Sequence, residues 1–221
     1  MDRSAIVLAG GFSSRFGQDK AVLKFNNKPL IRHVVDNVRP IVDEVIVVTN
    51  NQERADKYAK LVGPNVKFAF DIEDAMGPLV GALTGFEAAQ GKYSSLLAAD
   101  LPLVSCDVVD LLFELCHGRS AVIPRWSNQQ IEPLHAVYHT QTALEAAKIA
   151  VEEGNFNVRA MIENMGSVRY VSMLVFQQMD PDLKTFFNIN TPLDLKKAEI
   201  LLKPRPNKSK DKLKAKQKRR C

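Results

Sequence analysis

The chain has 221 residues, 46% of them hydrophobic, which suits one large or two small globular domains with a buried core. No run of about 18 apolar residues occurs, so we expect no transmembrane helix and a cytoplasmic location. The three cysteines form no Cys-x-x-Cys pair, which excludes a structural zinc site of the usual spacing. The net charge of +5 hides two parts: seven Lys, three Arg and one Asp give residues 203–221 a charge of +9, which leaves −4 for residues 1–202.

Strand and helix patterns alternate along the chain. Short runs of apolar, often β-branched residues predict strands at residues 4–9, 44–49, 66–70, 94–99, 121–123, 134–138, 168–172 and 186–189. Apolar residues at helical spacing, bounded by proline and glycine, predict the helices. These are expected between Pro29 and Pro40, over 52–62, from Gly77-Pro78 onward, over 107–116, 141–152 and 157–165, and from Thr191-Pro192 onward.

Strands separated by helices of about ten or more residues predict an α/β fold. We expect a three-layer, doubly wound, mainly parallel sheet of the Rossmann-like kind, with residues 1–202 forming one domain. Residues 203–221 are low in complexity and strongly basic, so we expect a disordered tail. Such a tail either acts as a solubilising segment or makes weak electrostatic contacts with an acidic partner or nucleic acid. It holds no aromatic residue to stack on bases, so specific nucleic-acid binding is not expected.

Polar segments follow three of the predicted strands. Residues 10–20 come directly after the first strand, Asp71 after the third and Asp100 after the fourth. In an open parallel sheet, ligands bind beyond the carboxyl ends of the strands. The sequence therefore predicts that these three segments meet at one edge of the sheet and form a binding site there.

The segment 10–20 has the parts of a phosphate-binding loop. It reads Gly-Gly-Phe-Ser-Ser-Arg-Phe-Gly-Gln-Asp-Lys, which is neither a Walker A loop nor a Gly-x-Gly-x-x-Gly dinucleotide fingerprint. Gly10 and Gly11 let the backbone approach an anion closely and direct N–H groups at it. Arg15 offers a planar fork to phosphate oxygens, and Lys20 offers a compact positive charge. This combination predicts that the loop handles a triphosphate.

Five motifs in chain order resemble one enzyme family. They are Leu8-Ala9-Gly10-Gly11 with Asp19-Lys20, Asp71 with Gly77-Pro78-Leu79-Val80-Gly81, Ala99-Asp100-Leu101-Pro102, Glu132-Pro133-Leu134-His135-Ala136-Val137-Tyr138, and Asn188-Ile189-Asn190-Thr191-Pro192. Together they resemble the nucleotidyltransferases that act on molybdenum cofactor, and among these the guanylyltransferases. The resemblance spans nearly all of residues 1–202 and does not reach the basic tail.

The resemblance implies a reaction and its residues. GMP would pass from GTP to the phosphate of molybdenum cofactor (molybdopterin), with Mg²⁺ as cofactor and pyrophosphate leaving. It also implies transient contacts with cofactor-synthesis or acceptor proteins. Expected catalytic residues are Arg15, Lys20 and Asp100. Expected nucleotide-binding residues are Leu8, Ala9, Gly10, Gly11, Lys20, Asp71 and Asp100. Expected metal ligands are Asp100, whose position at a strand end suits a magnesium ligand, and Asn190.

Several alternatives remain open at this point. Asp100 could instead cap a helix, Asn190 could be a turn residue, and Asp71 a solvated loop acid. His135, where the family often has an apolar residue, is expected to have a surface or packing role rather than a catalytic one. The reaction could be cytidylyl transfer to the same cofactor, or nucleotidyl transfer to a sugar phosphate, a phospholactate or a cobinamide phosphate. A non-catalytic nucleotide- or RNA-binding module is the alternative outside enzymes.

Overall fold

A seven-stranded sheet forms the centre of the protein, in the order β11-β9-β10-β8-β1-β6-β7. The computed structural model describes residues 1–10, 12–13, 18–71 and 77–202. The strands of this sheet are β1 (Arg3–Leu8), β6 (Glu44–Thr49), β7 (Val66–Phe70), β8 (Tyr93–Ala98), β9 (Ala121–Arg125), β10 (His135–His139) and β11 (Val168–Ser172). All neighbouring strands pair in parallel except β10, which is antiparallel to both β8 and β9.

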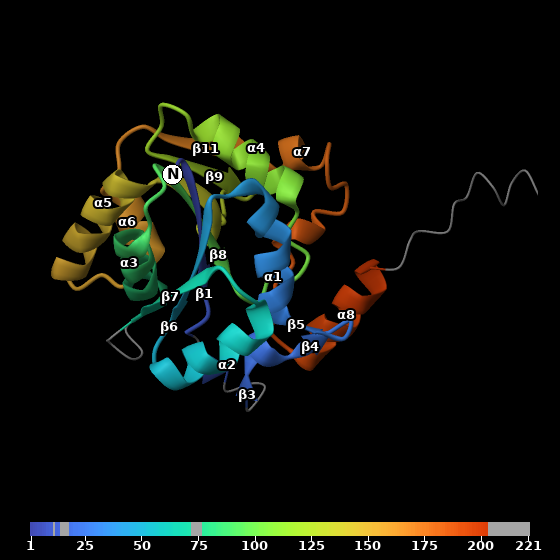
Figure 1. Cartoon of the computed structure of the whole chain (residues 1–221). Helices are drawn as coiled ribbons and strands as arrows, with labels where there is room; N and C mark the ends of the chain where they lie inside the picture. The colour runs from blue at the N-terminus through green and yellow to red at the C-terminus, as the bar shows by residue number, and fades with distance from the viewer. Residues whose placement is uncertain (11, 14–17, 72–76, 203–221) are drawn as a thin grey trace, which may run out of the picture.

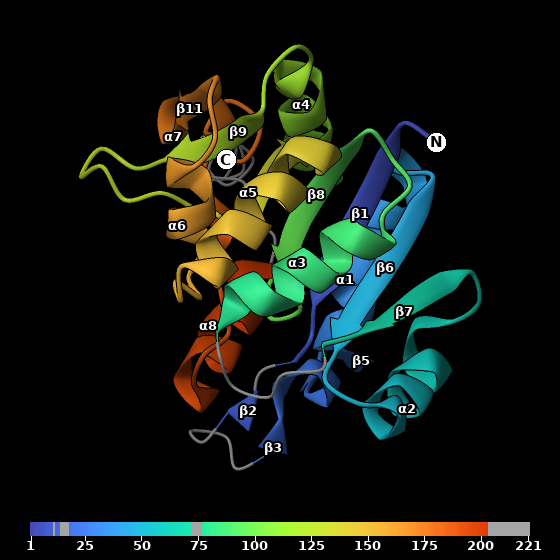
Figure 2. The same cartoon turned by 90° about the vertical axis from the view of Figure 1, so that its left-hand side faces the viewer.

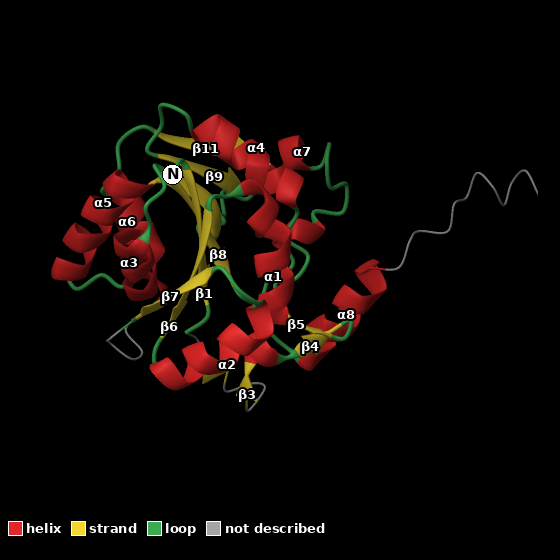
Figure 3. Ribbon diagram, in the orientation of Figure 1, coloured by secondary structure: helices red, strands yellow, loops and turns green. Residues whose placement is uncertain are grey.

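Helices cover both faces of this sheet, as Figures 1 and 3 show. The helices are α1 (Leu30–Val38), α2 (Gln52–Val62), α3 (Pro78–Ala88), α4 (Cys106–Cys116), α5 (Thr140–Glu152), α6 (Val158–Glu163), α7 (Met173–Phe176) and α8 (Pro192–Leu202). Short 3₁₀ turns are η1 (Lys20–Val22), η2 (Arg39–Ile41) and η3 (Lys184–Phe186). Among the described residues, no helix combines the length and the apolarity that crossing a membrane requires.

Two hydrophobic clusters separate the three layers. In β1, Ala5 and Val7 pack with α1, α2, α4 and α7 on one face, whereas Ile6 packs with α3, α5 and α6 on the other. Alternate side chains of a strand point to opposite faces, so a strand that is apolar throughout must be covered on both sides. The three-layer α/β fold predicted from the sequence is therefore confirmed.

The carboxyl ends of the central strands lie together, and pairing continues just past them. Ala9 N donates to Val48 O at 2.8 Å, and Ala99 N donates to Leu8 O at 3.0 Å. Asp71 N donates to Thr49 O at 2.9 Å in the same way. Two small hairpins, β2 (Phe12–Ser13) with β3 (Gln18–Asp19) and β4 (Lys24–Phe25) with β5 (Lys28–Pro29), extend from this part of the chain. Figure 2 shows β2 and β3 beyond the sheet, at the end where α8 and α2 lie.

The strand predicted at residues 186–189 is wrong. This segment is the end of η3 followed by irregular backbone, although Phe186 and Ile189 are both buried. Phe186 packs with the α4 side of the sheet, and Ile189 packs with Phe25 and Leu30 beneath α8. The segment crosses the carboxyl edge of the sheet, where Ile189 N donates to Asp100 O at 3.0 Å, so its apolar residues are buried without strand pairing.

Candidate functional site

Three distant segments converge on the Lys20 ammonium. Lys20 Nζ donates to Asn190 Oδ1 at 2.6 Å and to Asp100 Oδ2 at 3.2 Å. The side chains of Lys20 and Asp100 are 20% and 19% exposed, so both remain reachable from solvent in a partly desolvated setting. Charge interactions are stronger in such a setting than in bulk water. The side-chain oxygens of Asp100 and Asn190, which were predicted to bind a metal, therefore point at the same place, and the Lys20 ammonium lies there.

Local structure holds each member of this group. Asp100 lies two residues after the end of β8, and its carbonyl accepts from Ile189 N, which ties the two segments together. Asp194, in the first turn of α8, accepts from Asn190 N at 3.2 Å and from Thr191 Oγ1 at 2.8 Å. The Thr191 hydroxyl bond lowers the pKa of the Asp194 carboxyl, which keeps this acceptor charged. Asn190 is thus fixed by the start of α8.

The ends of the glycine-rich loop are held by α2. Tyr58 Oη contacts Asp19 Oδ2 at 2.8 Å and Ala9 O at 3.2 Å, and Arg54 Nη1 donates to Gly10 O at 3.2 Å. Asp19 Oδ1 accepts from Ala21 N at 3.0 Å and so caps η1, whose first residue is Lys20. Sequence reasoning missed Tyr58 and Arg54. The sequence held one signal for Tyr58: it lies on the apolar side of a helix that is otherwise rich in charged residues, which marks it as a buried residue with a polar group.

Asp71 lies beside the first turns of α3. A β-carbon at Gly81 would lie 3.6 Å from Asp71 Oδ2 and 3.6 Å from Leu8 Cδ2, so both side chains approach the same spot on the helix. Gly77 precedes α3 with φ +126°, and a β-carbon there would lie 2.5 Å from Phe156 O. Only glycine fits this position, since the backbone of another segment comes so close.

The structure brings most of the predicted site residues to one edge of the sheet. Leu8 ends β1, Ala9 and Gly10 follow it, and Asp71 follows β7 two strands away in the sheet. Gly11 and Arg15, also predicted for the site, lie outside the described residues. A β-carbon at Gly10 would meet no described atom within 4 Å, so contacts within the described protein do not require glycine there.

The donor set at this edge suits a hard cation. Asp100 and Asn190 offer one carboxylate and one amide oxygen, which is the kind of ligand Mg²⁺ prefers alongside water and phosphate oxygens. Within the described ranges, no group of three or more His, Cys, Asp or Glu side chains could hold a metal ion by itself. A metal held by Asp100 and Asn190 would complete its coordination with water or phosphate oxygens.

His135 packs close to this edge without the features of a catalytic base. It faces Leu97 across the β10–β8 pairing, is 1% exposed, and stacks near the Phe186 ring at 4.5 Å between centroids. Burial lowers its pKa from 6.5 to about 3, so the imidazole is neutral at physiological pH. Its Nε2 pairs with Thr185 Oγ1 at 3.3 Å. The packing role predicted for this histidine fits its surroundings.

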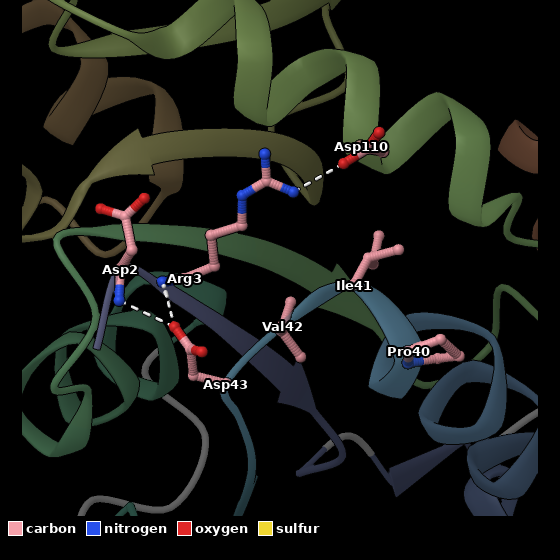
Figure 4. Close-up of a pocket in the computed structure, with 7 residues that line it drawn as sticks. All are labelled: Asp2, Arg3, Pro40, Ile41, Val42, Asp43 and Asp110. Atoms are coloured by element: carbon pink, nitrogen blue, oxygen red, sulfur yellow. Dashed lines mark hydrogen bonds and ion pairs between the residues drawn. The ribbon is translucent and has the colours of Figure 1, made fainter.

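A separate hollow of about 460 Å³ lies at the amino ends of β1 and β6, away from these residues (Figure 4). Its lining residues are Asp2, Arg3, Pro40, Ile41, Val42, Asp43 and Asp110. The Arg3 guanidinium reaches Asp110 on α4, and Asp43 Oδ2 accepts from the backbone N–H groups of Asp2 and Arg3. The groups around this hollow are hydrogen-bonded to one another, and they lie at the end of the sheet opposite the candidate site.

Comparison with known proteins gives consistent matches along the chain. Residues 5–168 match the family described as the MobA-like NTP transferase domain. A relative from Methanosarcina mazei, described as "Probable molybdenum cofactor guanylyltransferase", is 39% identical over 87% of this chain and 88% of its own length. A relative from Desulfosudis oleivorans, described as "Molybdenum cofactor guanylyltransferase", is 31% identical over 90% of this chain and 96% of its own. Among solved structures, "Molybdopterin-guanine dinucleotide biosynthesis protein A" from Archaeoglobus fulgidus superposes with a TM-score of 0.76 at 27% identity, covering 90% of this chain and 97% of that one.

Proposed function

The chain belongs to the MobA-like NTP transferase family, and from that premise we propose that it transfers GMP from GTP to the phosphate of molybdenum cofactor, forming the guanine dinucleotide cofactor. The observation that carries this proposal is the convergence of Lys20, Asp100 and Asn190 beside the end of the glycine-rich loop. The names of relatives that match most of the chain support the choice of nucleotide and acceptor.

The chain's residues would act on the triphosphate mainly by position and charge. Backbone N–H groups of Gly10 and Gly11 would approach the phosphates, because glycine lets an anion come close to the main chain. Leu8 and Ala9 would border the nucleotide, since the Ala9 N–H already donates to Val48 O. Arg15 and Lys20 would neutralise charge as pyrophosphate departs. Asp71 would contact the nucleotide at the edge of α3.

The reaction needs no strong base on the protein. An oxygen of the acceptor phosphate attacks the α-phosphorus of GTP, the bond to the bridging oxygen of the β-phosphate breaks, and pyrophosphate leaves with that electron pair. The acceptor phosphate is anionic near neutral pH, so no proton must be removed before attack. Holding the two phosphates in line and balancing their charge supplies the catalysis.

Mg²⁺ fits the oxygen pair of Asp100 and Asn190, and when bound it would supply charge neutralisation and a template for the phosphates. Lys20 now donates to both of these oxygens. Because two cations at one point repel each other, we expect Lys20 to leave these oxygens for a phosphate when the metal and nucleotide bind. The same proposal places the protein in the cytoplasm, where GTP is made.

The test is pyrophosphate release from four nucleotides. Purified full-length protein is mixed with Mg²⁺, with either molybdenum cofactor or a sugar phosphate as acceptor, and with GTP, CTP, ATP or UTP in turn. The proposal expects release with GTP and formation of the guanine dinucleotide. A preference for CTP would overturn the guanylyl assignment in favour of cytidylyl transfer. Release only with a sugar phosphate as acceptor would overturn the choice of acceptor, and no release with any pair would overturn the enzyme assignment.

A further inference from the structure

We infer that helix α2 positions the two described ends of the phosphate loop: the single hydroxyl proton of Tyr58 is shared between Asp19 Oδ2 and Ala9 O, and through Asp19 the hydroxyl sets the place of Lys20. This inference deepens the proposed function and rests on it, since the loop matters for catalysis only if it holds a nucleotide. Tyr58 acts in this inference through Asp19 and Lys20, so its role is positioning.

The Tyr58 hydroxyl joins two points ten residues apart in the chain. Ala9 O lies 3.2 Å from it and Asp19 Oδ2 lies 2.8 Å from it, and these residues flank the segment 10–18. Ala9 is itself anchored to the sheet, since its N–H donates to Val48 O. The hydroxyl therefore ties the far end of the loop to the sheet at the end of β1.

Asp19 transmits this restraint to Lys20. The Asp19 side chain is only 12% exposed, and its two oxygens have different partners. Oδ2 accepts from Tyr58, and Oδ1 caps η1 by accepting from Ala21 N. Because Lys20 is the first residue of η1, the direction of its side chain depends on how Asp19 is held.

Other side chains of α2 face the same loop. Lys57 and Tyr58 lie three and four residues after Arg54, which places each of them next to Arg54 on the helix surface. Arg54 Nη1 donates to Gly10 O, and Lys57 Nζ lies 3.8 Å from Asp19 Oδ2. Asn51 caps the helix by accepting from Arg54 N at 2.9 Å, which fixes the turn that carries this arginine. The helix thus contacts both ends of the loop.

The hydroxyl has little reason to be buried other than this bridge. Tyr58 is fully buried among apolar residues such as Val34 and Val62, where a phenylalanine ring would pack as well. A buried hydroxyl is costly unless it is hydrogen-bonded. Burial, and then the Asp19 carboxylate, raise the pKa of Tyr58 above its usual value, so the group stays a proton donor at physiological pH.

Tyr58→Phe removes the bridge and keeps the ring. We expect kcat/KM for GTP to fall by about tenfold or more, because the loop ends and Lys20 lose their common restraint. Tyr93→Phe is the matched control: Tyr93 is also buried, its hydroxyl accepts from Gly118 N at 3.3 Å, and it lies at the amino end of β8, away from the loop. The control should keep kcat/KM within about twofold. Equal effects of the two variants would overturn the inference.

A double-mutant cycle separates positioning from general destabilisation. If Tyr58 acts through Lys20, then Tyr58→Phe should change kcat/KM by less than about threefold in a Lys20→Ala background, because the group it places is already gone. A full tenfold loss in that background would overturn the route through Asp19 and Lys20. The thermal midpoints of all variants, followed by circular dichroism, should stay above the assay temperature by a wide margin.

Nucleotide binding distinguishes a failure of this inference from a failure of the proposed function. The dissociation constants of the wild type and Tyr58→Phe are measured by calorimetry with Mg²⁺ and each of the four nucleoside triphosphates. If the wild type binds a nucleotide other than GTP, the guanylyl assignment fails, yet a weaker constant for Tyr58→Phe with that nucleotide still supports the loop inference. Equal constants for both proteins would overturn the inference alone. A wild type that binds none of the four would overturn both.

Discussion

Replacing Lys20 by alanine removes the ammonium that contacts both Asp100 and Asn190. The loss to folding should be small, about 1 kcal/mol, because both charged side chains are one-fifth exposed and water can replace the ammonium around Asp100. The loss to catalysis should be larger. Removing one charged or hydrogen-bonding group that stabilises a transition state costs about 2.7–4 kcal/mol, or on the order of 10²–10³ in rate. Lys20→Ala should therefore be folded and slow.

The assay is pyrophosphate release at saturating GTP, Mg²⁺ and molybdenum cofactor, with a thermal melt of each protein. Lys148→Ala is the matched control, because Lys148 on α5 also pairs with a carboxylate, Glu87, at 3.1 Å, but on the outer side of α3. This control should keep the wild-type rate and nearly the wild-type melting point. Lys20→Met keeps the apolar stem of the side chain and should lose as much activity as Lys20→Ala.

The catalytic role of the Lys20 charge can be refuted in two ways. Turnover by Lys20→Ala within about threefold of wild type would show that the ammonium only pairs with Asp100 and Asn190 and takes no part in the reaction. A slow Lys20→Ala together with a fast Lys20→Met would point to packing of the stem rather than charge. Either result would remove Lys20 from the proposed catalytic residues.

Three further outcomes are expected. Asn190→Ala should raise the Mg²⁺ concentration for half-maximal rate by about tenfold or more, and a chelator should abolish wild-type turnover until Mg²⁺ is restored; indifference to chelation would contradict the metal role. Burial lowers the pKa of His135 to about 3, so below about pH 6.5 the unfolded chain binds a proton that the folded protein does not. Wild-type unfolding free energy, from urea titrations at pH 7, 6 and 5, should therefore fall with decreasing pH by up to about 1.4 kcal/mol per unit more than that of His135→Leu, and parallel curves would contradict this. Truncation after Leu202 should leave turnover unchanged, since residues 1–202 hold every proposed site residue; a large loss would give the basic tail a role in catalysis.

Much of the fold follows from local sequence patterns. The strands at 44–49, 66–70 and 168–172 and the helix at 52–62 coincide with their predicted ranges, because apolar or β-branched runs end at polar residues, glycine or proline. The residues at 186–189 show the limit of such patterns. Phe186 is buried against Trp126 and His135, and Ile189 packs with Phe25 and Leu30, all far away in the chain. Burial alone cannot distinguish a paired strand from a crossing segment. Two-residue strands such as β2 and β3 also have no pattern of their own.

The candidate site also has contacts that the sequence could predict and contacts that it could not. That Lys20 and Asp100 would meet could be predicted, because the carboxyl ends of parallel strands share one edge. The contact of Tyr58 with Asp19 could not, because helical spacing says which side of α2 is buried but not which loop it covers. The bond from Asn190 N to Asp194 could not be predicted either, because it depends on the backbone path before α8.

One lysine connects the stability of this edge to its chemistry. Asp100 stands at the end of an apolar strand, where a carboxylate without a partner would be costly. Lys20 offsets that cost in the free protein, and the oxygens it contacts are the same ones that a divalent cation with a nucleotide would use. Under the proposed function, a divalent cation held by Asp100 and Asn190 would take over the charge pairing that Lys20 provides, and the Lys20 ammonium would be available to the phosphates. The position of Lys20 relative to both partners would then matter for the reaction, so the inferred restraint from α2 through Asp19 would bear on function and not on folding alone.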